Sequence, residues 1–229
     1  MLKLWAIGVG LVAIGLIAAA IYWIANPSQA ELQLPEPLVP HHESLPQKTM
    51  TLHSADYRSL SNGFRPQRFR SFCGPASIAT VLRAYGETHV DQSDLFSSLG
   101  FKANAFFSGL TLAELAELAE RNGLRTYIVY ADTLTLDEFR QRLVANLASA
   151  GDYVLINYDR RSLSQSGVGH ISPVAAYNAT TDAFLVLDQA TYNYPFTWVP
   201  AALLYQATNT LDGKRSRGIL IVTGYNAHR

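Results

Sequence analysis

The stretch "RSFCGPASIATVLRAYG" at residues 70–86 holds the only cysteine of this 229-residue chain and decides how its fold is interpreted. Apolar side chains recur after the cysteine at helical spacing, at Ile78, Val81 and Leu82. The N-terminal end of a helix lowers a thiol's pKa through its dipole and its free N–H groups. The sequence therefore predicts a helix that begins near Cys73, and it leaves two interpretations of that thiol, a nucleophile or a small buried hydrophobe.

Two further helices are predicted by their N-terminal capping signals. Threonine is followed three residues later by glutamate at positions 111 and 135, and an apolar stripe follows each pair. Turn-forming residues then mark the ends. We expect helices over residues 111–122 and 135–150.

Short runs rich in β-branched and aromatic residues alternate with and follow these helices. The run "NATTD" from Asn178 is rich in turn formers and is expected to join two of the strands as a hairpin. Because helices come first and an antiparallel sheet second, the predicted fold class is α+β. The expected strands lie at residues 124–130, 152–158, 170–177, 183–188 and 217–225.

The composition limits the classes of function. Lys plus Arg and Asp plus Glu both number 18, so no overall field attracts nucleic acid, and no nucleic-acid partner is expected. An apolar content of 48% suffices for one full-sized core. We expect a single globular domain after the N-terminal segment.

The N-terminal segment has the pattern of a membrane anchor. Residues 4–24 carry no charge, and 21 helical residues can cross a bilayer core of about 30 Å. Lys3 favours a cytoplasmic N-terminus, which would place the body of the protein in the periplasm, held at the inner membrane. The alternative is a signal peptide cleaved near Ala30 and a secreted or periplasmic product.

The domain boundaries follow from this pattern. Residues 1–26 are assigned to the anchor or signal segment, and residues 27–53, with five prolines by position 50, to an extended linker. The catalytic domain is expected over residues 54–229. A lone cysteine forms no internal disulfide, so the domain has to be stable without one.

A cysteine nucleophile needs a base and a group that orients the base. Of six histidines, His170 opens an apolar strand after the glycine-rich "SQSGVGH", and Asp188 ends the next strand. Gln67, six residues before Cys73, offers a side-chain amide to an oxyanion. Each has an ordinary alternative, a turn carboxylate for Asp188 or a solvated amide for Gln67, but together the four describe a papain-like site.

At this point the chain resembles a known family, the phytochelatin synthases, papain-like enzymes that act on glutathione. The likeness covers roughly residues 55–224. It is carried by these stretches: "QRFRSFCGPASIATVLRAY" (67–85), "SGLTLAELAELAERNGL" (108–124), "INYDRRSLSQSGVGHISPVAAYN" (156–178), "LVLDQATYNYPFTWVPAALLYQA" (185–207) and "LDGKRSRGILIV" (211–222).

The resemblance implies a papain-like fold, with the nucleophile helix packed on an antiparallel sheet, and a mechanism. Cys73 would be the nucleophile, His170 the base and then the acid, and Asp188 the residue that orients His170. Gln67 and the Cys73 N–H would form the oxyanion hole. Cys73 would cleave the Cys–Gly bond of glutathione through a γ-glutamylcysteinyl thioester, whose acyl group passes to water or to a second glutathione.

Two departures from the family pattern bear on the acceptor and on metals. Thr191 and Asn193 stand where relatives carry basic residues, which favours hydrolysis over transfer to a second anionic glutathione. The Cys-rich C-terminal extension of plant members is missing from this sequence. We therefore expect no tightly bound cofactor and no protein metal site, with Cd²⁺ or Zn²⁺ entering as metal–glutathione thiolates.

Substrate contacts are expected from Gly169, Arg160 and Tyr194. A homodimer is left open. Two other interpretations remain: a leader peptidase of the C39 type, whose Gln-x5-Cys-Gly-Pro opening is similar, and a non-catalytic papain-like module that binds thiol–metal complexes or a partner.

Overall fold

The computed structural model describes residues 15–19, 22, 52–53 and 55–226. Its centre is a seven-stranded antiparallel sheet in the order β2-β9-β3-β4-β5-β6, with β1 paired to β4. The strands are β1 (Leu52–His53), β2 (Leu124–Tyr130), β3 (Tyr153–Asp159), β4 (Gly169–Asn178), β5 (Ala183–Val186), β6 (Thr197–Pro200) and β9 (Gly218–Tyr225). A small hairpin consists of β7 (Leu211–Asp212) and β8 (Arg215–Ser216).

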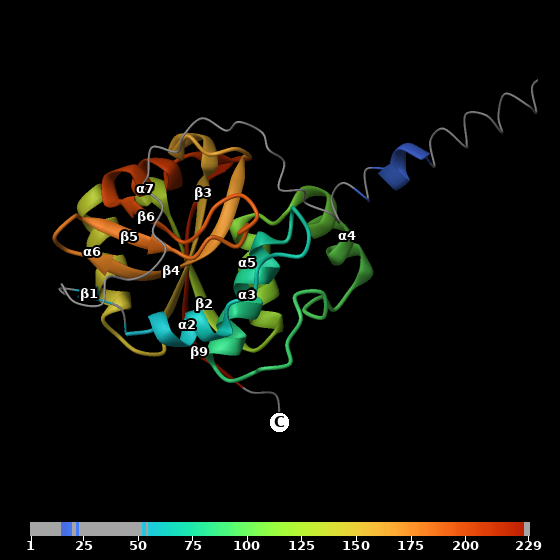
Figure 1. The fold of residues 1–229 in the computed structure, drawn as a ribbon, viewed down its shortest axis with the longest axis horizontal. Coiled ribbons are helices and arrows are strands. Elements are labelled where there is room, and N and C mark those ends of the chain that lie inside the picture. The colour runs from blue at the N-terminus through green and yellow to red at the C-terminus, as the bar shows by residue number, and fades with distance from the viewer. Residues whose placement is uncertain (1–14, 20–21, 23–51, 54, 227–229) are drawn as a thin grey trace, which may run out of the picture.

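Helices cover both faces of the sheet (Figure 1). One face carries α2 (Tyr57–Gly63), α3 (Cys73–Ala84), α4 (Leu99–Ser108) and α5 (Leu112–Arg121). The other carries α6 (Leu136–Leu147) and α7 (Ala201–Thr208). Two short 3₁₀ helices are η1 (Ala131–Thr133) and η2 (Arg160–Leu163).

The sheet separates two hydrophobic clusters, and its central strands contribute to both. On β3, Leu155 packs with the α3 and α5 side, whereas Val154 and Ile156 pack with the α6 and α7 side. A strand that is buried on both faces has no polar alternation. This explains why every residue of β3 is buried.

The α+β plan predicted from the sequence is confirmed. Both capping boxes are present, since Thr111 and Thr135 each accept a hydrogen bond from the backbone N–H three residues on, and the glutamate there bonds back. The predicted β4–β5 hairpin is also confirmed. Helices α2, α4 and α7 and strand β6 were not predicted.

The first turn of α3 lies directly against β4. Ser77 donates from its hydroxyl to Cys73 O at 2.8 Å and to Ile171 O at 3.2 Å, which ties the helix to the strand. A Cβ at Gly74 would meet Ile171 and two leucine side chains at 3.1 to 3.4 Å, so glycine permits this close approach. As a result Cys73 lies beside His170, the residue that precedes Ile171 on β4.

The predicted membrane segment at residues 4–24 lies largely outside the described residues. Within the described part of the chain, no helix is both long and apolar enough to cross a bilayer. The linker predicted at residues 27–53 is described only at its last two positions, so the predicted domain boundaries stay a prediction.

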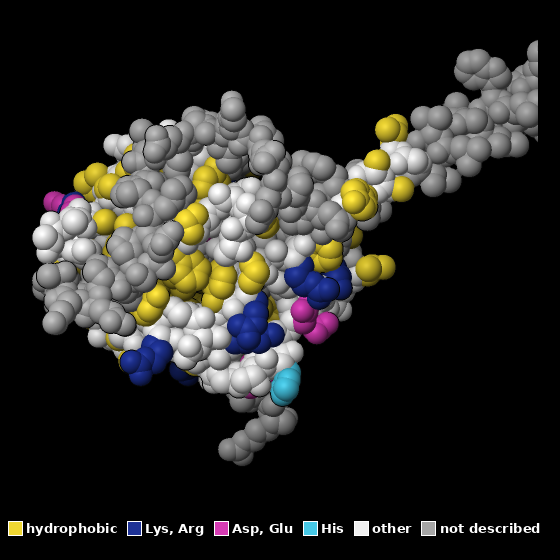
Figure 2. All heavy atoms as spheres, in the orientation of Figure 1, with side chains coloured by type: hydrophobic (Ala, Val, Ile, Leu, Met, Phe, Trp, Pro, Cys, Tyr) yellow, Lys and Arg dark blue, Asp and Glu magenta, His cyan; other side chains and the backbone are white. Residues whose placement is uncertain are grey.

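The visible surface agrees with the balanced composition. Figure 2 shows Lys and Arg side chains in small separate groups on this face, one of them beside acidic side chains. Such a distribution produces no extended positive stripe on this face that could follow a nucleic-acid backbone.

Candidate active site

Three of the four residues expected to carry chemistry meet in one hollow of about 460 Å³, and the fourth, Asp188, is buried behind His170. The hollow opens where α3 begins against β4, and Gln67, Cys73 and His170 all line it. The rest of its wall comes from the C-terminal end of α4, from β3, η2, β4 and β7, and from the segments between elements: Arg70, Ser71, Phe106, Phe107, Ser108, Gly109, Leu110, Asn157, Arg160, Ser166, Gly167, Val168, Gly169, Ile171, Ala190, Tyr192, Asn193, Asp212 and Arg217.

Cys73 is the first residue of α3, and the neighbouring His170 lowers the pKa of its thiol through charge and hydrogen bonding. Its side chain is 8% exposed, and what it exposes faces the hollow. Because His170 turns Nε2 toward Asp188, the other ring nitrogen, Nδ1, is the one left for the thiol. In space, the predicted cysteine, histidine and aspartate therefore follow one another, from thiol to imidazole to carboxylate.

His170 and Asp188 form a close, buried ion pair. His170 Nε2 lies 3.0 Å from Asp188 Oδ1, and both side chains are almost completely buried. The contact is not a well-aligned hydrogen bond, since the ring N–H does not point along the line to the carboxylate. Electrostatic attraction thus dominates this contact.

The same carboxylate oxygen binds two other donors. Arg160, itself 4% exposed, donates from Nη2 to Asp188 Oδ1 at 2.7 Å, and the backbone N–H of Ala190 donates to it at 2.8 Å. Tyr158 donates from its hydroxyl to Asp188 Oδ2 at 3.4 Å. Asp188 is therefore held rigidly, and its charge is shared between the histidine and the arginine.

These contacts favour the charged forms of the pair. Burial opposes ionisation of Cys73, but the charge and hydrogen bond of His170 outweigh burial and lower the pKa of the thiol. Burial and Arg160 both lower the pKa of His170, yet Asp188 and the thiolate raise it above the ordinary value. The pKa of Asp188 is held far below its usual range despite burial, because Arg160 and His170 stabilise the carboxylate. Both shifts favour a thiolate–imidazolium pair, the reactive form of a cysteine nucleophile.

Gln67 also lines the hollow, where hydrogen bonds of its backbone and of its side-chain amide hold it in place. Its N–H donates to Gln189 O at 2.9 Å, and its side chain is 5% exposed. The amide nitrogen Nε2 donates to Arg70 O and to the hydroxyl of Tyr192, each at 2.8 Å. Gln67 therefore lines the same hollow as Cys73, but both hydrogens of its amide are engaged.

The residues predicted to contact substrate occupy different places. Gly169 lies at the rim, where a Cβ would come within 2.7 Å of Arg217 Nη2, and Arg160 lines the hollow while bound to Asp188. Tyr194 is 2% exposed and accepts a hydrogen bond from Ser166 N. The Arg160 guanidinium lies over the Tyr194 ring, 5.0 Å from the ring centre. The position of Tyr194 supports Arg160 from behind the wall.

Sequence reasoning missed two residues on the wall. Tyr192 lies in the turn after Asp188, and Arg217 ends the β7–β8 hairpin, 6% exposed. Neither has a motif of its own, and only the tertiary contact to Gln67 or to Gly169 identifies it. Of the two positions that lack the family's basic residue, Asn193 lines the hollow and Thr191 is exposed.

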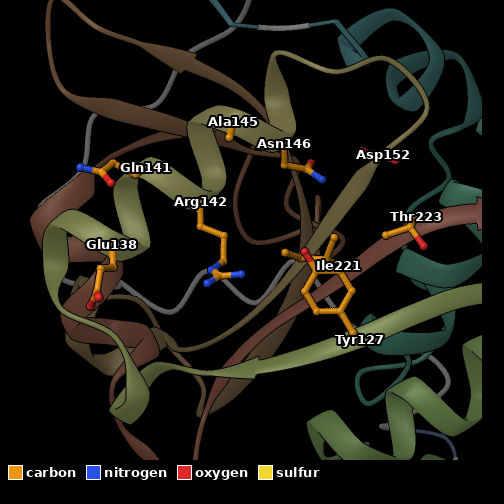
Figure 3. Close-up of a pocket in the computed structure, with 9 residues that line it drawn as sticks. All are labelled: Tyr127, Glu138, Gln141, Arg142, Ala145, Asn146, Asp152, Ile221 and Thr223. Carbon is orange, nitrogen blue, oxygen red and sulfur yellow. The ribbon is translucent and has the colours of Figure 1, made fainter.

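A second hollow of about 490 Å³ lies between α6 and strands β2 and β9 (Figure 3). Arg142 and Asn146 project into it from the helix and Tyr127 borders it from the sheet, but it contains no thiol and no histidine. Across the described residues, no group of three or more His, Cys, Asp and Glu side chains is arranged to hold a metal ion. The first hollow is therefore the candidate active site.

A family model described as phytochelatin synthase matches residues 30–219. The chain belongs to the phytochelatin synthase family. Curated relatives include glutathione gamma-glutamylcysteinyltransferase 3 of Lotus japonicus, 27% identical over 87% of this chain and 43% of the relative. Another is glutathione gamma-glutamylcysteinyltransferase 1 of Triticum aestivum, 31% identical over 72% of this chain and 35% of the relative. The enzyme of that name from Schizosaccharomyces pombe is 28% identical over 69% of this chain and 40% of its own length.

This family member thus spans less than half the length of the curated relatives that it matches. The match covers all of the residues that form the candidate active site up to Arg217. The family assignment and the geometry of the hollow therefore rest on the same part of the chain.

Alkylation by iodoacetamide tests the state of the thiol. Because His170 lowers the pKa of Cys73, we expect one equivalent to react with the folded protein, and the midpoint of the pH dependence to lie below that of an ordinary thiol. In His170→Ala the pKa of the buried thiol rises and this midpoint moves to higher pH, and a rise of one unit slows alkylation by about tenfold at a pH below both midpoints. Mass spectrometry after timed quenching measures both rates. A folded wild type that resists alkylation, or equal rates in the two proteins, would refute the ion pair.

Substitution of Arg160 tests how the site is tuned. Arg160 lowers the pKa of both Cys73 and His170. In Arg160→Gln both pKa values should therefore rise, and both limbs of the pH dependence of activity should move to higher pH. Loss of one partner of a buried pair also lowers the free energy of unfolding by about 3–5 kcal/mol. The pH dependence of alkylation follows the thiol limb, and urea unfolding follows stability.

The matched control for Arg160 is its neighbour. Arg161 has a 68% exposed side chain that pairs with Asp159 at 3.1 Å, so Arg161→Gln should leave the profile unchanged. An unshifted thiol limb in a folded Arg160→Gln protein would show that Arg160 does not tune the thiol.

Proposed function

We propose that this chain is a cysteine-dependent acyltransferase or hydrolase of glutathione. The observation that carries the proposal is the Cys73 thiol at the start of α3, which lines one hollow with His170, while His170 Nε2 lies 3.0 Å from the buried Asp188. The relatives are named for transfer of the γ-glutamylcysteinyl group of glutathione. A nucleophile helix packed on an antiparallel sheet supports a papain-like interpretation of the fold.

In the proposed acylation step, the Cys73 thiolate attacks the carbonyl carbon of the Cys–Gly peptide bond. The carbonyl oxygen becomes an oxyanion beside the Cys73 N–H, which lies in the first turn of α3 and has no acceptor within the helix. Collapse breaks the C–N bond, the His170 imidazolium gives its proton to the leaving glycine nitrogen, and a γ-glutamylcysteinyl thioester remains. Asp188 keeps the imidazole oriented and stabilises its charged form.

In the deacylation step, His170 is neutral and acts as the base. It takes a proton from water as the oxygen attacks the thioester, which releases γ-glutamylcysteine and restores the thiolate–imidazolium pair. Attack by the amine of a second glutathione would instead give a phytochelatin with two γ-glutamylcysteine units. Either acceptor leaves the enzyme unchanged.

The wall of the hollow supports water as the main acceptor. Arg70, Arg160 and Arg217 line it, and their charge suits the carboxylates of one glutathione. Arg160 is already neutralised by Asp188, and Arg217 lies 3.6 Å from Asp212. With Asn193 and Thr191 at positions that are basic in relatives, little positive charge is left for a second tripeptide. We propose that Cd²⁺ or Zn²⁺, where it matters, enters as a thiolate complex of the substrate.

Incubation of the full chain with glutathione, with and without Cd²⁺, tests this proposal. We expect equimolar glycine and γ-glutamylcysteine with few oligomers, because water is the favoured acceptor. Mass spectrometry resolves the products, and Cys73→Ala should abolish glycine release.

Other outcomes assign other functions. Oligomeric products would show that transfer to a second glutathione succeeds without the basic residues. No glycine release from the wild type would overturn the glutathione assignment and favour the C39-type leader peptidase. Metal–glutathione binding that survives in Cys73→Ala, without turnover in the wild type, would favour a binding module.

We also propose that residues 4–24 hold the domain at the inner membrane with the catalytic part in the periplasm. The support is the uncharged run in the sequence and Lys3 before it. A protease added to spheroplasts should digest the domain, and deletion of residues 4–24 should release it from the membrane fraction. Protection of the domain from protease would refute the periplasmic location.

A further inference from the structure

The hydrogen bonds of Gln67 raise a problem for its expected role. A side-chain amide nitrogen has two hydrogens, and those of Gln67 Nε2 are bound to Arg70 O and to the Tyr192 hydroxyl, both at 2.8 Å. Donation to an oxyanion would require one of these bonds to break in a side chain that is 5% exposed. A buried group that loses its partner costs about 1–3 kcal/mol.

Tyr192 has the hydrogen that Gln67 lacks. Its oxygen accepts from Gln67, so its own hydrogen points elsewhere, and no described residue accepts it. Tyr192 lines the hollow together with Cys73, and burial raises the pKa of its phenol. The hydroxyl therefore stays protonated beside the nucleophile.

The turn that carries Tyr192 is built on the same carboxylate that faces His170. Ala190 donates from its N–H to Asp188 Oδ1 at 2.8 Å, and Asn193 N donates to Ala190 O at 2.8 Å to close the turn. Tyr194, two residues on, is held by its hydrogen bond from Ser166 N. Tyr192 is thus fixed relative to the histidine from both sides.

We propose that the hydroxyl of Tyr192, and not the amide of Gln67, donates the side-chain hydrogen bond to the oxyanion that forms when Cys73 attacks a carbonyl. Gln67 then acts as a positioning residue, because its side-chain N–H donates to the Tyr192 oxygen and polarises the O–H bond. Every hydrogen bond of the resting site is kept, and the oxyanion gains two donors, the Cys73 N–H and Tyr192. The inference rests on the proposed role of Cys73 as nucleophile, but not on glutathione as substrate.

Two reagents separate this role from a structural one. p-Nitrophenyl acetate acetylates the thiol through an oxyanion at the acetyl carbonyl and releases p-nitrophenolate. Iodoacetamide alkylates the same thiol by direct displacement of iodide, with no oxyanion. The full chain is tested as wild type, Tyr192→Phe, Gln67→Ala and the double variant, with Tyr205→Phe as control. Tyr205 donates to Leu134 O at 2.6 Å, among residues of the α6 and α7 side.

We expect Tyr192→Phe to lower the acetylation rate constant roughly tenfold to a hundredfold. This loss is smaller than the one that removal of an oxyanion donor causes in amide hydrolysis. The alkylation rate of Tyr192→Phe should stay within about twofold of the wild-type rate, since the thiolate is unchanged. For the control Tyr205→Phe, the rates of both reactions should stay within about twofold of the wild type. The double variant should be no slower than Tyr192→Phe, because Gln67 acts through the tyrosine.

Two results would overturn the proposal. Acetylation by Tyr192→Phe at the wild-type rate, with Gln67→Ala slowed, would return the donor role to Gln67. Equal loss of acetylation and alkylation in Tyr192→Phe would show that the tyrosine only maintains the fold. Because neither reagent is a peptide, a wild type inert to glutathione overturns the substrate and leaves this test intact.

Discussion

The site depends on one oxygen atom, Oδ1 of Asp188, and on the three groups that surround it. A buried carboxylate is stable only when its charge is balanced. Arg160 at 2.7 Å and the Ala190 N–H at 2.8 Å balance it before His170 is considered. Removing any one partner changes the charge seen by the others, so thiol, imidazole and carboxylate behave as one coupled group.

This arrangement links the chemistry to the shape of the cleft. The Ala190 N–H that binds the carboxylate also starts the turn that carries Tyr192, and Arg160 rests on the ring of Tyr194. This part of the wall of the hollow is therefore built from contacts to the orienting residue. A displacement of Asp188 would move the histidine and the wall together.

The elements predicted from sequence are those with a local physical signal. The capping boxes at Thr111 and Thr135 set two helix starts within one residue, because the box is a bond between near neighbours. Helix α4 escaped prediction because "LGFKANAFFS" buries only Ala105 and has no apolar stripe, and α7 because it is eight residues long and follows a proline. The cysteine, histidine, aspartate and glutamine were found through strand ends and motif. Tyr192 and the Arg160–Asp188 pair were not, because their partners lie 125 and 28 residues away along the chain.

The position of β9 has a consequence for biosynthesis. Residues 218–225 form a strand that lies between β2 and β3, so the sheet stays split until this strand is inserted. On a ribosome, α3 and β4 leave the exit tunnel long before it. The pairing that completes their shared core therefore waits for this strand, and the packing behind Cys73 and His170 is finished only after β9 has been made. The order of the elements along the chain thus delays the reactive thiol relative to synthesis of its own helix.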